Sequence, residues 1–356
     1  MQKLQFEALR RIGLTLAVAQ ELIHLLEQHP GCIPVRVTEV HRETVRLDDG
    51  TQDLPARRMP SLARGLADQD DAVAVGDWGL ARCDAHGDWW LTHCLQPFSA
   101  LVRRDGDGLR HIVVSNVDTA LLVMGLDLDF SLRRIERFLA LVQASGVRPV
   151  VVLSKPDLCA DMPRALAQLQ ARLPADVPHV VLDGRNAAAA EVLAPWLAPA
   201  QTLVLLGSSG AGKSTLANTL MGHAVQETGA TREGDGRGRH TTTSRSLHRL
   251  PGGACLIDTP GVRTLRPDAS EASLAASFND VARLSLQCRF RDCQHRGEPG
   301  CAVREGVDGD RLNNFHKLQR EMRRDTLTAL ERRQQLSEWK ARGRAGRANL
   351  RAKRGE

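Results

Sequence analysis

The chain has 356 residues, of which 42% are hydrophobic and 25% are charged, and its net charge is +6. At about 150 residues per domain, this length predicts two or three domains of a globular protein with a real core. The basic charge favours a polyanionic partner. Because only 3% of the residues are aromatic and none is Tyr, we expect such contacts to rely on phosphates more than on base stacking.

The N-terminal segment has neither the features of a secretory signal nor those of a membrane span. Residues 1–11 lack the short apolar core and the small-residue cleavage site of a signal peptide. The apolar stretch 14–26 is interrupted by Glu21 and His24, so it falls short of the ~20 residues that a bilayer requires. We therefore expect a cytoplasmic protein without a membrane partner, in which cysteines stay reduced.

A helical pattern and then a series of short strands are predicted for the first hundred residues. Helical periodicity extends from Gln5 to Gln28 and ends at His29-Pro30-Gly31. From Pro34 to about Gln96, β-type runs alternate with turns such as Asp48-Asp49-Gly50. Strands this short and closely spaced are typical of a small barrel or sandwich; they are expected at 35–40, 44–47, 72–75, 78–83 and 89–93.

The pattern changes near His111, where strands begin to alternate with helices. Helices are predicted at 131–143 and 213–221, and apolar strands at 111–115, 121–125, 149–153, 202–206 and 254–257. This alternation predicts a parallel α/β sheet that is covered on both faces. From about Ser270 the chain turns helical, and a charged helix is expected over 312–339.

The strongest motif lies between a predicted strand and a predicted helix. It has two glycines that bracket four residues, followed by Lys-Ser, and this is the phosphate-binding P-loop pattern. Glycines let backbone N–H groups converge on phosphate oxygens, and the helix N-terminus adds its dipole. We expect Lys213 to contact the β and γ phosphates and Ser214 to ligate Mg²⁺. The motif is Gly207, Ser208, Ser209, Gly210, Ala211, Gly212, Lys213, Ser214 and Thr215.

Two further motifs narrow the choice of nucleotide. Asp258-Thr259-Pro260-Gly261 follows a predicted strand; Asp258 can hold Mg²⁺ through water, and the Gly261 N–H can meet the γ-phosphate. Ser154-Lys155-Pro156-Asp157 also follows a strand, where GTPases usually have Asn-Lys-x-Asp. Asp157 would accept two hydrogen bonds from guanine, which adenine cannot supply, and the Lys155 stem would lie along the base.

The order of these motifs predicts a circular permutation. In ordinary GTPases the P-loop comes first and the guanine motif comes late, whereas here Asp157 precedes Gly207. Because chain termini often lie close together at the surface, the strand order can be rotated without disturbing the sheet.

A metal site is predicted near the C-terminus from the pattern C-x4-C-x-H-x5-C. Three thiolates and one imidazole make a closed tetrahedral set, which suits one structural Zn²⁺ and leaves no position for a catalytic water. The ligands would be Cys288, Cys293, His295 and Cys301. The five other cysteines are scattered, as small buried hydrophobes are.

With these motifs the chain resembles the ribosome small-subunit-dependent GTPase A family, also called RsgA, YjeQ or EngC. The resemblance covers roughly Pro34 to Lys317 and also rests on Asn116-Val117-Asp118 and on the Gly-Arg-His-Thr-Thr-Thr run 238–243. It implies an N-terminal OB-fold barrel at 34–102, a permuted α/β GTPase domain at 103–267 and a zinc domain with a basic helix and tail at 268–356. Residues 1–33 form a helical extension that lies outside the resemblance and has no assigned role.

The resemblance also implies how hydrolysis would occur. Residues 234–240 would belong to a switch loop that GTP orders over 234–243, in which Thr242, or alternatively Thr241, ligates Mg²⁺ when the γ-phosphate is present. His240 would position the attacking water or would contact RNA, and both readings stay open. Val262 stands where many GTPases have a Gln, so slow intrinsic turnover and an external activating group are predicted.

Two positions depart from the usual GTPase pattern. Ser154 replaces an Asn, which predicts a weaker brace of the base loop, and Asp183-Gly184 stands where a Ser-Ala pair is expected.

The function that the resemblance implies is a GTP hydrolase in late maturation of the 30S subunit, stimulated by that subunit. Its partners would be GTP/GDP, the 30S subunit and 16S rRNA, and we expect a monomer. The alternative is a nucleotide-gated rRNA-binding module with negligible hydrolysis, and the basic C-terminal helix fits RNA contact or a solvated surface.

Overall fold

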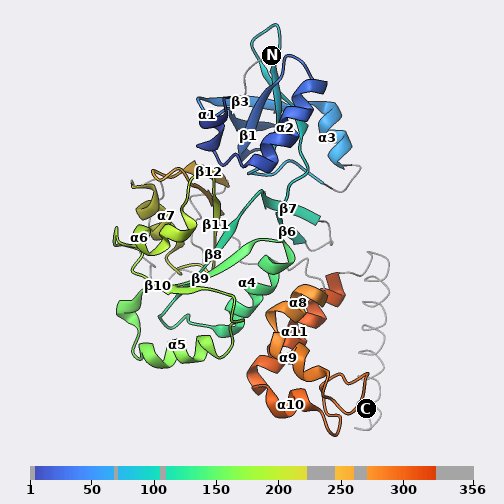
Figure 1. The fold of residues 1–356 in the computed structure, drawn as a ribbon, viewed down its shortest axis with the longest axis vertical. Helices are drawn as coiled ribbons and strands as arrows, with labels where there is room; N and C mark the ends of the chain where they lie inside the picture. The colour runs from blue at the N-terminus through green and yellow to red at the C-terminus, as the bar shows by residue number, and fades with distance from the viewer. Residues whose placement is uncertain (1–4, 68–70, 105–109, 223–244, 260–270, 326–356) are drawn as a thin grey trace, which may run out of the picture.

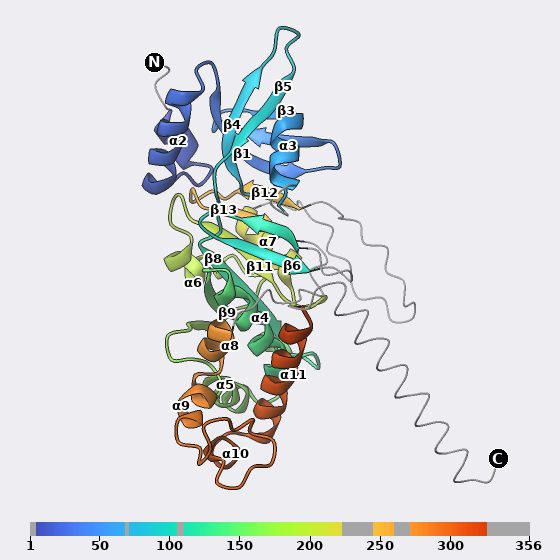
Figure 2. The same cartoon turned by 90° about the vertical axis from the view of Figure 1, so that its right-hand side faces the viewer.

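The computed structural model describes residues 5–67, 71–104, 110–222, 245–259 and 271–325. These form three units stacked along the long axis of the molecule (Figure 1). A barrel with the N-terminal helices lies at one end, an α/β sheet lies in the middle, and a helical unit with the C-terminal helix α11 lies at the other end (Figure 2).

The first unit is a closed five-stranded barrel. Its strands follow the order β1-β2-β3-β5-β4, and β4 pairs with β1 to close it. Helix α3 (Pro60–Ala67) lies between the third and fourth strands, which is the OB-fold arrangement and confirms the expected barrel. The strands are β1 (Ile33–Val40), β2 (Thr44–Asp48), β3 (Asp53–Arg58), β4 (Trp78–Cys83) and β5 (Trp89–Cys94).

Two details of the barrel differ from the sequence prediction. The strand expected at 72–75 is wrong: this segment is a loop, and only Val75 forms an isolated bridge, with Val114. Strand β3 was not predicted, because Pro55 lies in its middle and proline removes a ladder donor. Pro55 nevertheless pairs opposite Arg46 of β2.

The N-terminal extension folds as two helices instead of one continuous run. Helix α1 (Phe6–Arg10) and helix α2 (Leu16–Gln28) are separated at Gly13, whose φ of +95° favours glycine. A Cβ on Gly13 would lie 2.0 Å from Nη1 of Arg36. Buried side chains of both helices pack against Trp78 and Leu80 of the barrel.

The central sheet contains five parallel strands in the order β10-β9-β8-β11-β13, with β12 antiparallel at the end. Helices α4 (Leu132–Ala144) and α5 (Met162–Gln170) pack on one face, and α6 (Ala189–Leu193) and α7 (Lys213–Met221) pack on the other. The predicted doubly covered α/β sheet is therefore confirmed. Its strands are β8 (Thr119–Gly125), β9 (Arg148–Ser154), β10 (His179–Val181), β11 (Thr202–Leu206), β12 (Ser246–Arg249) and β13 (Cys255–Asp258).

The helical unit packs on α4 through a buried ion-pair network. Arg311 is 3% exposed; it donates to Glu136 Oε1 of α4 at 2.7 Å and to Asp280 Oδ2 at 2.8 Å. The expected charged helix begins at Gly309, and its part beyond Asp325 lies outside the described residues. The helices of this unit are α8 (Glu271–Ser277), α9 (Asn279–Ser285), α10 (Ala302–Gly306) and α11 (Gly309–Asp325).

The barrel and the central sheet share a joint built around Arg36. A hairpin of β6 (Ala100–Arg104) and β7 (Arg110–Ser115) leads from one unit to the other, and the pair Glu39–Ser246 joins β1 to β12. Arg36 is completely buried, and burial lowers the pKa of its guanidinium. It donates to four oxygens from separate segments: Ile12 O at 2.5 Å, Thr202 Oγ1 at 2.9 Å, Asn116 O at 3.0 Å and Gly76 O at 3.3 Å.

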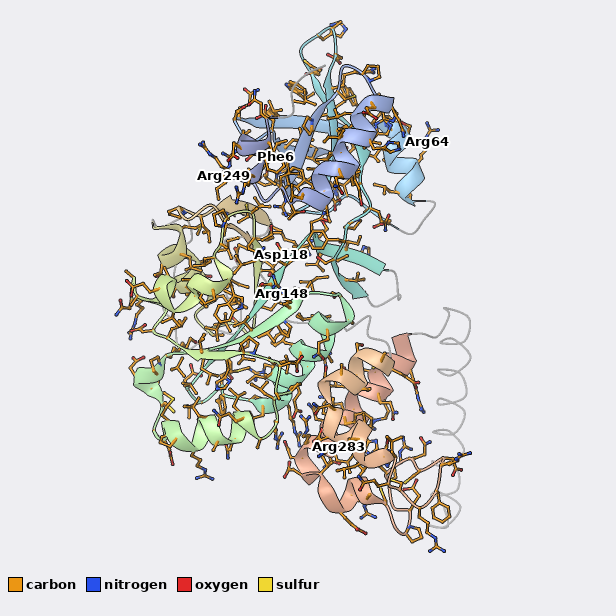
Figure 3. All side chains as sticks on the ribbon, viewed as in Figure 1. Phe6, Arg64, Asp118, Arg148, Arg249 and Arg283 are labelled. Atoms are coloured by element: carbon orange, nitrogen blue, oxygen red, sulfur yellow. The ribbon has the colours of Figure 1, made fainter. Side chains whose placement is uncertain are left out.

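Asn116 and Asp118 give this joint its second layer. The Asn116 amide donates to Gly76 O at 3.0 Å, and its own oxygen accepts from the Phe98 N–H at 3.2 Å. Asp118 accepts from the Thr202 N–H at 2.8 Å. Figure 3 shows Asp118 and Arg249 on the side of the sheet that faces the barrel. The motif Asn116-Val117-Asp118 therefore belongs to the joint between units.

We expect Arg36→Met to lower the free energy of unfolding by about 3–5 kcal/mol, because it removes four buried hydrogen bonds. Arg57→Met is the matched control, since Arg57 is exposed on the same barrel and its loss should cost within about 0.5 kcal/mol. Urea denaturation of both variants measures the difference. Equal stability of the two variants would show that the buried guanidinium does not secure the joint.

Candidate functional site

The nucleotide-type motifs converge at one edge of the central sheet. The P-loop follows β11, the Ser154–Asp157 loop follows β9, and Asp258 ends β13. Because these strands are parallel, their carboxyl ends meet on the same side, which is where open α/β sheets bind ligands. The reversed order along the chain therefore does not separate the motifs in space.

The P-loop geometry requires glycine at two of its positions. A Cβ on Gly207 would lie 2.2 Å from Val123 O of the neighbouring strand β8. Gly212 has a φ of +89° and is the N-cap residue of α7. The N-terminus of α7 therefore adjoins the loop, and an anion is favoured at such a position.

Lys213 lies across this loop. Its ammonium donates to Ser208 O at 2.7 Å and to Gly207 O at 3.0 Å. Both acceptors belong to the loop that the phosphate motif predicts to surround the phosphates, so the amine is already held at the predicted site. The positive charge and the helix N-terminus together make this loop suited to a polyphosphate.

Ser154 forms a hydrogen bond between the base loop and the P-loop, although it stands where GTPases usually have an Asn. Its side chain is 3% exposed, and its hydroxyl donates to Ala211 O of the P-loop at 2.7 Å. This single hydrogen bond joins the loop after β9 directly to the loop after β11. The shorter serine side chain can span the gap because the two loops lie in contact at this point.

A small hollow beside this brace has the residues expected for a base pocket. Its volume is about 170 Å³, and its lining includes Ser154, Lys155, Asp157, Gly184, Gly212 and Thr215. Lys155 has a φ of 57°, and its ammonium donates to Asp127 Oδ2 at 2.6 Å. Gly184, in the poorly matched loop, accepts from Thr219 Oγ1 of α7 at 2.6 Å, so this loop is also held against the P-loop helix.

Arg185 also lines this pocket, although it was not among the site residues predicted from the sequence. Arg185 Nη2 is 3.1 Å from Asp157 Oδ2, and its Nε is 2.9 Å from Asp183 Oδ1. The hydrogen bonds with Asp183 and the charge of Asp157 raise the pKa of Arg185. No motif signals this residue, because its partners come together only when β9 and β10 pair.

The remaining predicted site residues are only partly described. Asp258 is 6% exposed at the end of β13, and Thr259 Oγ1 donates to Leu205 O at 3.0 Å, which ties this end to β11. Ser214 lies in the first turn of α7. The other predicted residues lie outside the described part of the chain; they are Thr241, Thr242, His240, Gly261 and Val262.

The four predicted metal ligands form a compact cluster in the helical unit. Their ligand atoms all lie within 4.8 Å of one another. His295 Nδ1 is 3.6 Å from Cys288 Sγ and 3.5 Å from Cys301 Sγ, and the two sulfurs are 4.0 Å apart. A tetrahedron with bonds of ~2.3 Å to sulfur and ~2.0 Å to nitrogen has edges of about 3.5–3.8 Å. Cys288, Cys293, His295 and Cys301 can therefore hold a metal ion with little movement.

Glu298 stabilises the loop between the ligands. Its carboxylate accepts from the N–H groups of Gln294 at 2.8 Å, Arg296 at 2.8 Å and Gly297 at 2.9 Å. These backbone hydrogen bonds, with that from Gly297 the largest cause, lower the pKa of Glu298 to about 2. The loop that carries His295 is thus held by a permanently charged acceptor.

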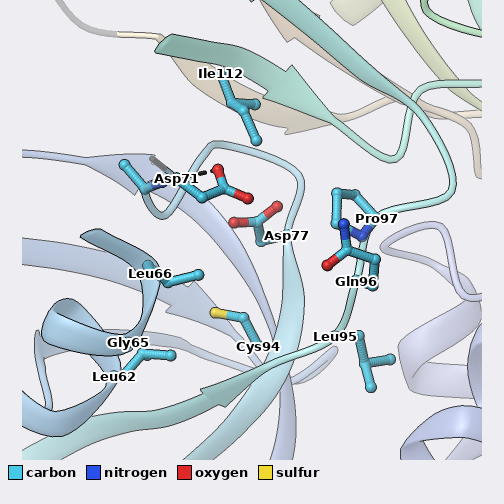
Figure 4. Close-up of a pocket in the computed structure, with 11 residues that line it drawn as sticks. Leu62, Gly65, Leu66, Asp71, Asp77, Cys94, Leu95, Gln96, Pro97 and Ile112 are labelled. Atoms are coloured by element: carbon cyan, nitrogen blue, oxygen red, sulfur yellow. Dashed lines mark hydrogen bonds between the residues drawn. The ribbon is translucent and has the colours of Figure 1, made fainter. Parts of the chain in front are cut away.

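A separate hollow of about 350 Å³ lies between the barrel and the β6–β7 hairpin. Figure 4 shows the carboxyl groups of Asp71 and Asp77 facing each other inside it, with Ile112 of the hairpin on the far side and Cys94 below. Asp77 accepts from the Ala74 N–H at 2.8 Å and from the Ser115 hydroxyl. Burial raises the pKa of Asp77 to about 6, and burial also raises the pKa of the Cys94 thiol.

Comparison with known proteins identifies relatives over most of the chain. A model of the RsgA GTPase family matches residues 95–267. A protein named small ribosomal subunit biogenesis GTPase RsgA, from Xanthomonas oryzae pv. oryzae (strain PXO99A), is 43% identical over 303 residues, which cover 83% of this chain and 82% of the relative. The protein of the same name from Xylella fastidiosa (strain 9a5c) is 43% identical over 300 residues, covering 82% and 86%.

Two solved structures share the fold. YjeQ from Thermotoga maritima superposes with a TM-score of 0.60 at 24% identity, covering 82% of this chain and 98% of that chain. YloQ, described as a circularly permuted GTPase, gives 0.55 at 21% identity, covering 84% and 98%. The permuted arrangement predicted from the motif order is confirmed. In the described ranges, no helix combines the length and the apolar character that crossing a bilayer requires.

The raised pKa of Asp77 predicts a pH dependence of stability with a definite sign. The pKa of Asp77 in the folded protein, about 6, lies above the ordinary value of 3.8. The protonated carboxyl therefore stabilises the folded state below pH 4, and this contribution is lost as pH rises through 6. We expect Asp77→Asn to gain about 2–3 kcal/mol relative to the unsubstituted protein between pH 4 and pH 7. Urea unfolding across this range measures the gain, and parallel pH profiles would contradict it.

Proposed function

This chain belongs to the RsgA GTPase family, and we propose that it is a GTP hydrolase that acts in late maturation of the 30S ribosomal subunit and is stimulated by that subunit. A GTPase role in maturation of the small subunit follows from the names of its relatives. The late step and the stimulation are the finer parts of the proposal. They are supported by the predicted need for an activating group from outside the chain.

One observation carries the proposal: the hydrogen bond from Ser154 Oγ to Ala211 O. It joins a phosphate-binding loop to a loop that ends in an acidic residue beside a pocket of about 170 Å³. A nucleoside polyphosphate needs both elements at this spacing, with the anion at the helix N-terminus and the base beside a carboxylate. Asp157 would select guanine because its carboxylate accepts the paired N1–H and N2–H donors.

The roles of the other residues follow from charge and position. The backbone of 207–212 would bind the phosphates, Ser208, Ser209, Gly210 and Ala211 among them, and Thr215 would lie beside the α-phosphate. Lys213 would move its ammonium from the loop carbonyls to the β and γ phosphates, where it stabilises the charge that develops on attack by water. The Gly261 N–H would reach the γ-phosphate.

The oxygen donors at this edge fit Mg²⁺, which GTPases generally use. A hard cation of this size prefers hydroxyl, carboxylate and phosphate oxygens, and Ser214 and the buried Asp258 supply the first two. Thr242 would add a second hydroxyl, and His240 would position the water. When bound, the ion neutralises phosphate charge; the chain's own residues orient the phosphates and limit the access of bulk water.

We also propose the domain limits 1–33, 34–102, 103–267 and 268–356 and the identity of the metal in the cluster. Three thiolates and one imidazole at tetrahedral spacing favour Zn²⁺ in a structural role. The barrel and the zinc domain would bind 16S rRNA on either side of the GTPase domain. The working unit would be a monomer in the cytoplasm, with GTP and GDP as its nucleotides.

The direct test is GTP hydrolysis with purified 30S subunits and with 50S subunits as a control. A catalytic group supplied from outside contributes up to about 10³–10⁵-fold in kcat to GTPases, so we expect a selective stimulation of about a hundred-fold or more by 30S. A slow rate that 30S leaves unchanged would instead favour the nucleotide-gated rRNA-binding module.

Asp157→Asn is the companion variant, because it should weaken GTP binding by about 10- to 100-fold through loss of a charged acceptor. Xanthine carries a carbonyl in place of the guanine 2-amino group. The amide of the variant can donate to this carbonyl, which the carboxylate cannot do. Binding of XTP by the variant would therefore show that it is folded. Unchanged GTP affinity would contradict the assignment of base reading to Asp157.

For the metal, we expect about one zinc ion per purified chain, and Cys293→Ser should lose it because three ligands hold a structural ion poorly. Cys83→Ser is the matched control, since Cys83 is exposed on the barrel and lies outside the cluster. Elemental analysis and thermal unfolding measure both effects. A chain that keeps its melting temperature after full removal of metal would contradict a structural role.

A further inference from the structure

In the base pocket, Arg185 pairs with Asp157, the acidic residue that is expected to bind guanine. Arg185 Nη2 lies 3.1 Å from Asp157 Oδ2, and both residues line the pocket. The same nitrogen lies 2.9 Å from Asp183 Oδ2. One guanidinium therefore bridges the loop after β9 and the loop after β10.

Asp183 orients this guanidinium through several hydrogen bonds. Its carboxylate accepts from Arg185 Nε at 2.9 Å and 3.2 Å, and from the Arg185 backbone N–H at 3.0 Å. Gly184 between them is tied to α7 through Thr219. The guanidinium of Arg185 is thus held in a position to contact Asp157. When it moves away from Asp157, Asp183 remains its partner.

The chemistry of the two donors explains why they compete. Guanine presents N1–H and N2–H to a carboxylate from a planar N–C–N fragment, and a guanidinium presents the same kind of donors from the same kind of fragment. A base that engages both oxygens of Asp157 therefore needs the oxygen that Arg185 contacts. Arg185 also lines the hollow that the base would enter.

We propose that Arg185 is an affinity-setting latch of the base pocket: it pairs with Asp157 in place of guanine, and the incoming base must displace it toward Asp183. This rests on the proposed function, in which Asp157 reads guanine. The base binds only when Arg185 has left Asp157. The apparent affinity for nucleotide is therefore the intrinsic affinity multiplied by the fraction of molecules in which the latch is open. A base without the 2-amino group engages one oxygen of Asp157 and can leave the other to Arg185, so the latch opposes guanine most.

The exposure of the pair sets the size of the effect. The side chains of Arg185 and Asp157 are 63% and 46% exposed, and exposed ion pairs are weak. We therefore expect Arg185→Ala to raise the affinity for GDP by about two- to five-fold. IDP lacks the 2-amino group and needs only one oxygen of Asp157, so it should gain less. The difference between the variant and the unsubstituted protein should shrink as NaCl is raised, because salt screens exposed charges.

Titration calorimetry with GDP and IDP tests the latch. Arg164→Ala is the matched control, because it removes an exposed arginine with the same change of net charge from α5; it should leave both affinities unchanged. A GDP affinity that stays equal or falls in Arg185→Ala would overturn the proposal, and a fall larger for GDP than for IDP would mean that Arg185 instead positions Asp157 for the base.

Asp157→Asn separates failure of the latch from failure of the proposed function. If this substitution leaves GDP affinity intact, the assignment of base reading to Asp157 is wrong and the latch is wrong with it. If it weakens GDP while Arg185→Ala changes nothing, only the latch is wrong. In the Asp157→Asn background, adding Arg185→Ala should give no further gain, because the two effects share one ion pair.

Discussion

The arrangement of the first two units depends on one buried guanidinium, whose hydrogen bonds within the described residues all go to uncharged oxygens. Arg36 is completely buried, and all four of its hydrogen bonds go to carbonyl or hydroxyl oxygens. Removing a charge from water costs several kcal/mol, so the side chain is tolerated only when every one of these acceptors is in place. They come from the N-terminal extension, the barrel and two parts of the central sheet. The joint therefore forms as a whole, and this gives Asn116 and Asp118 a structural reason to be present in the motif.

The flanking units attach to elements that neighbour those carrying the nucleotide-type loops. On the barrel side, β12 pairs with β13, whose last residue is Asp258, and Arg249 of β12 donates to Asp48 of the barrel at 3.0 Å. On the other side, Glu136 belongs to α4, which follows the central strand β8. Strand β8 in turn pairs with β9 and β11, which carry two of the loops. One element thus separates the barrel from the site, and two elements separate the helical unit from it.

The sequence predicted the parts of the site that depend on local pattern. The P-loop requires glycine at Gly207 and Gly212 for backbone reasons, and the cysteine spacing alone brings the four ligands within reach of one ion. What it could not predict depends on tertiary contact. Arg185 gains Asp157 as a partner only because β9 and β10 pair. In the apolar run at 72–75, residues 73–75 are buried, but the run joins the sheet only through one isolated bridge. The sequence predicts that Ser154 braces the base loop more weakly than an Asn would. In the structure its hydroxyl reaches Ala211 O, because the loop after β9 and the P-loop lie in contact.

The permutation itself has a mechanical consequence. With the guanine-type strand β9 early in the unit and the P-loop strand β11 late, Asp258 becomes the end of the last strand of the sheet. The chain then passes through residues 260–270 directly into α8 of the helical unit, while residues 223–244 lead into β12, which pairs with β1 of the barrel. In the unpermuted order, the segment after Asp258 would instead be followed by further strands and helices of the same sheet. Rotation of the order therefore places residues 260–270, where a response to the γ-phosphate is expected, next to the helical unit along the chain. This covalent connection adds to the contact that Arg311 makes with Glu136 of α4.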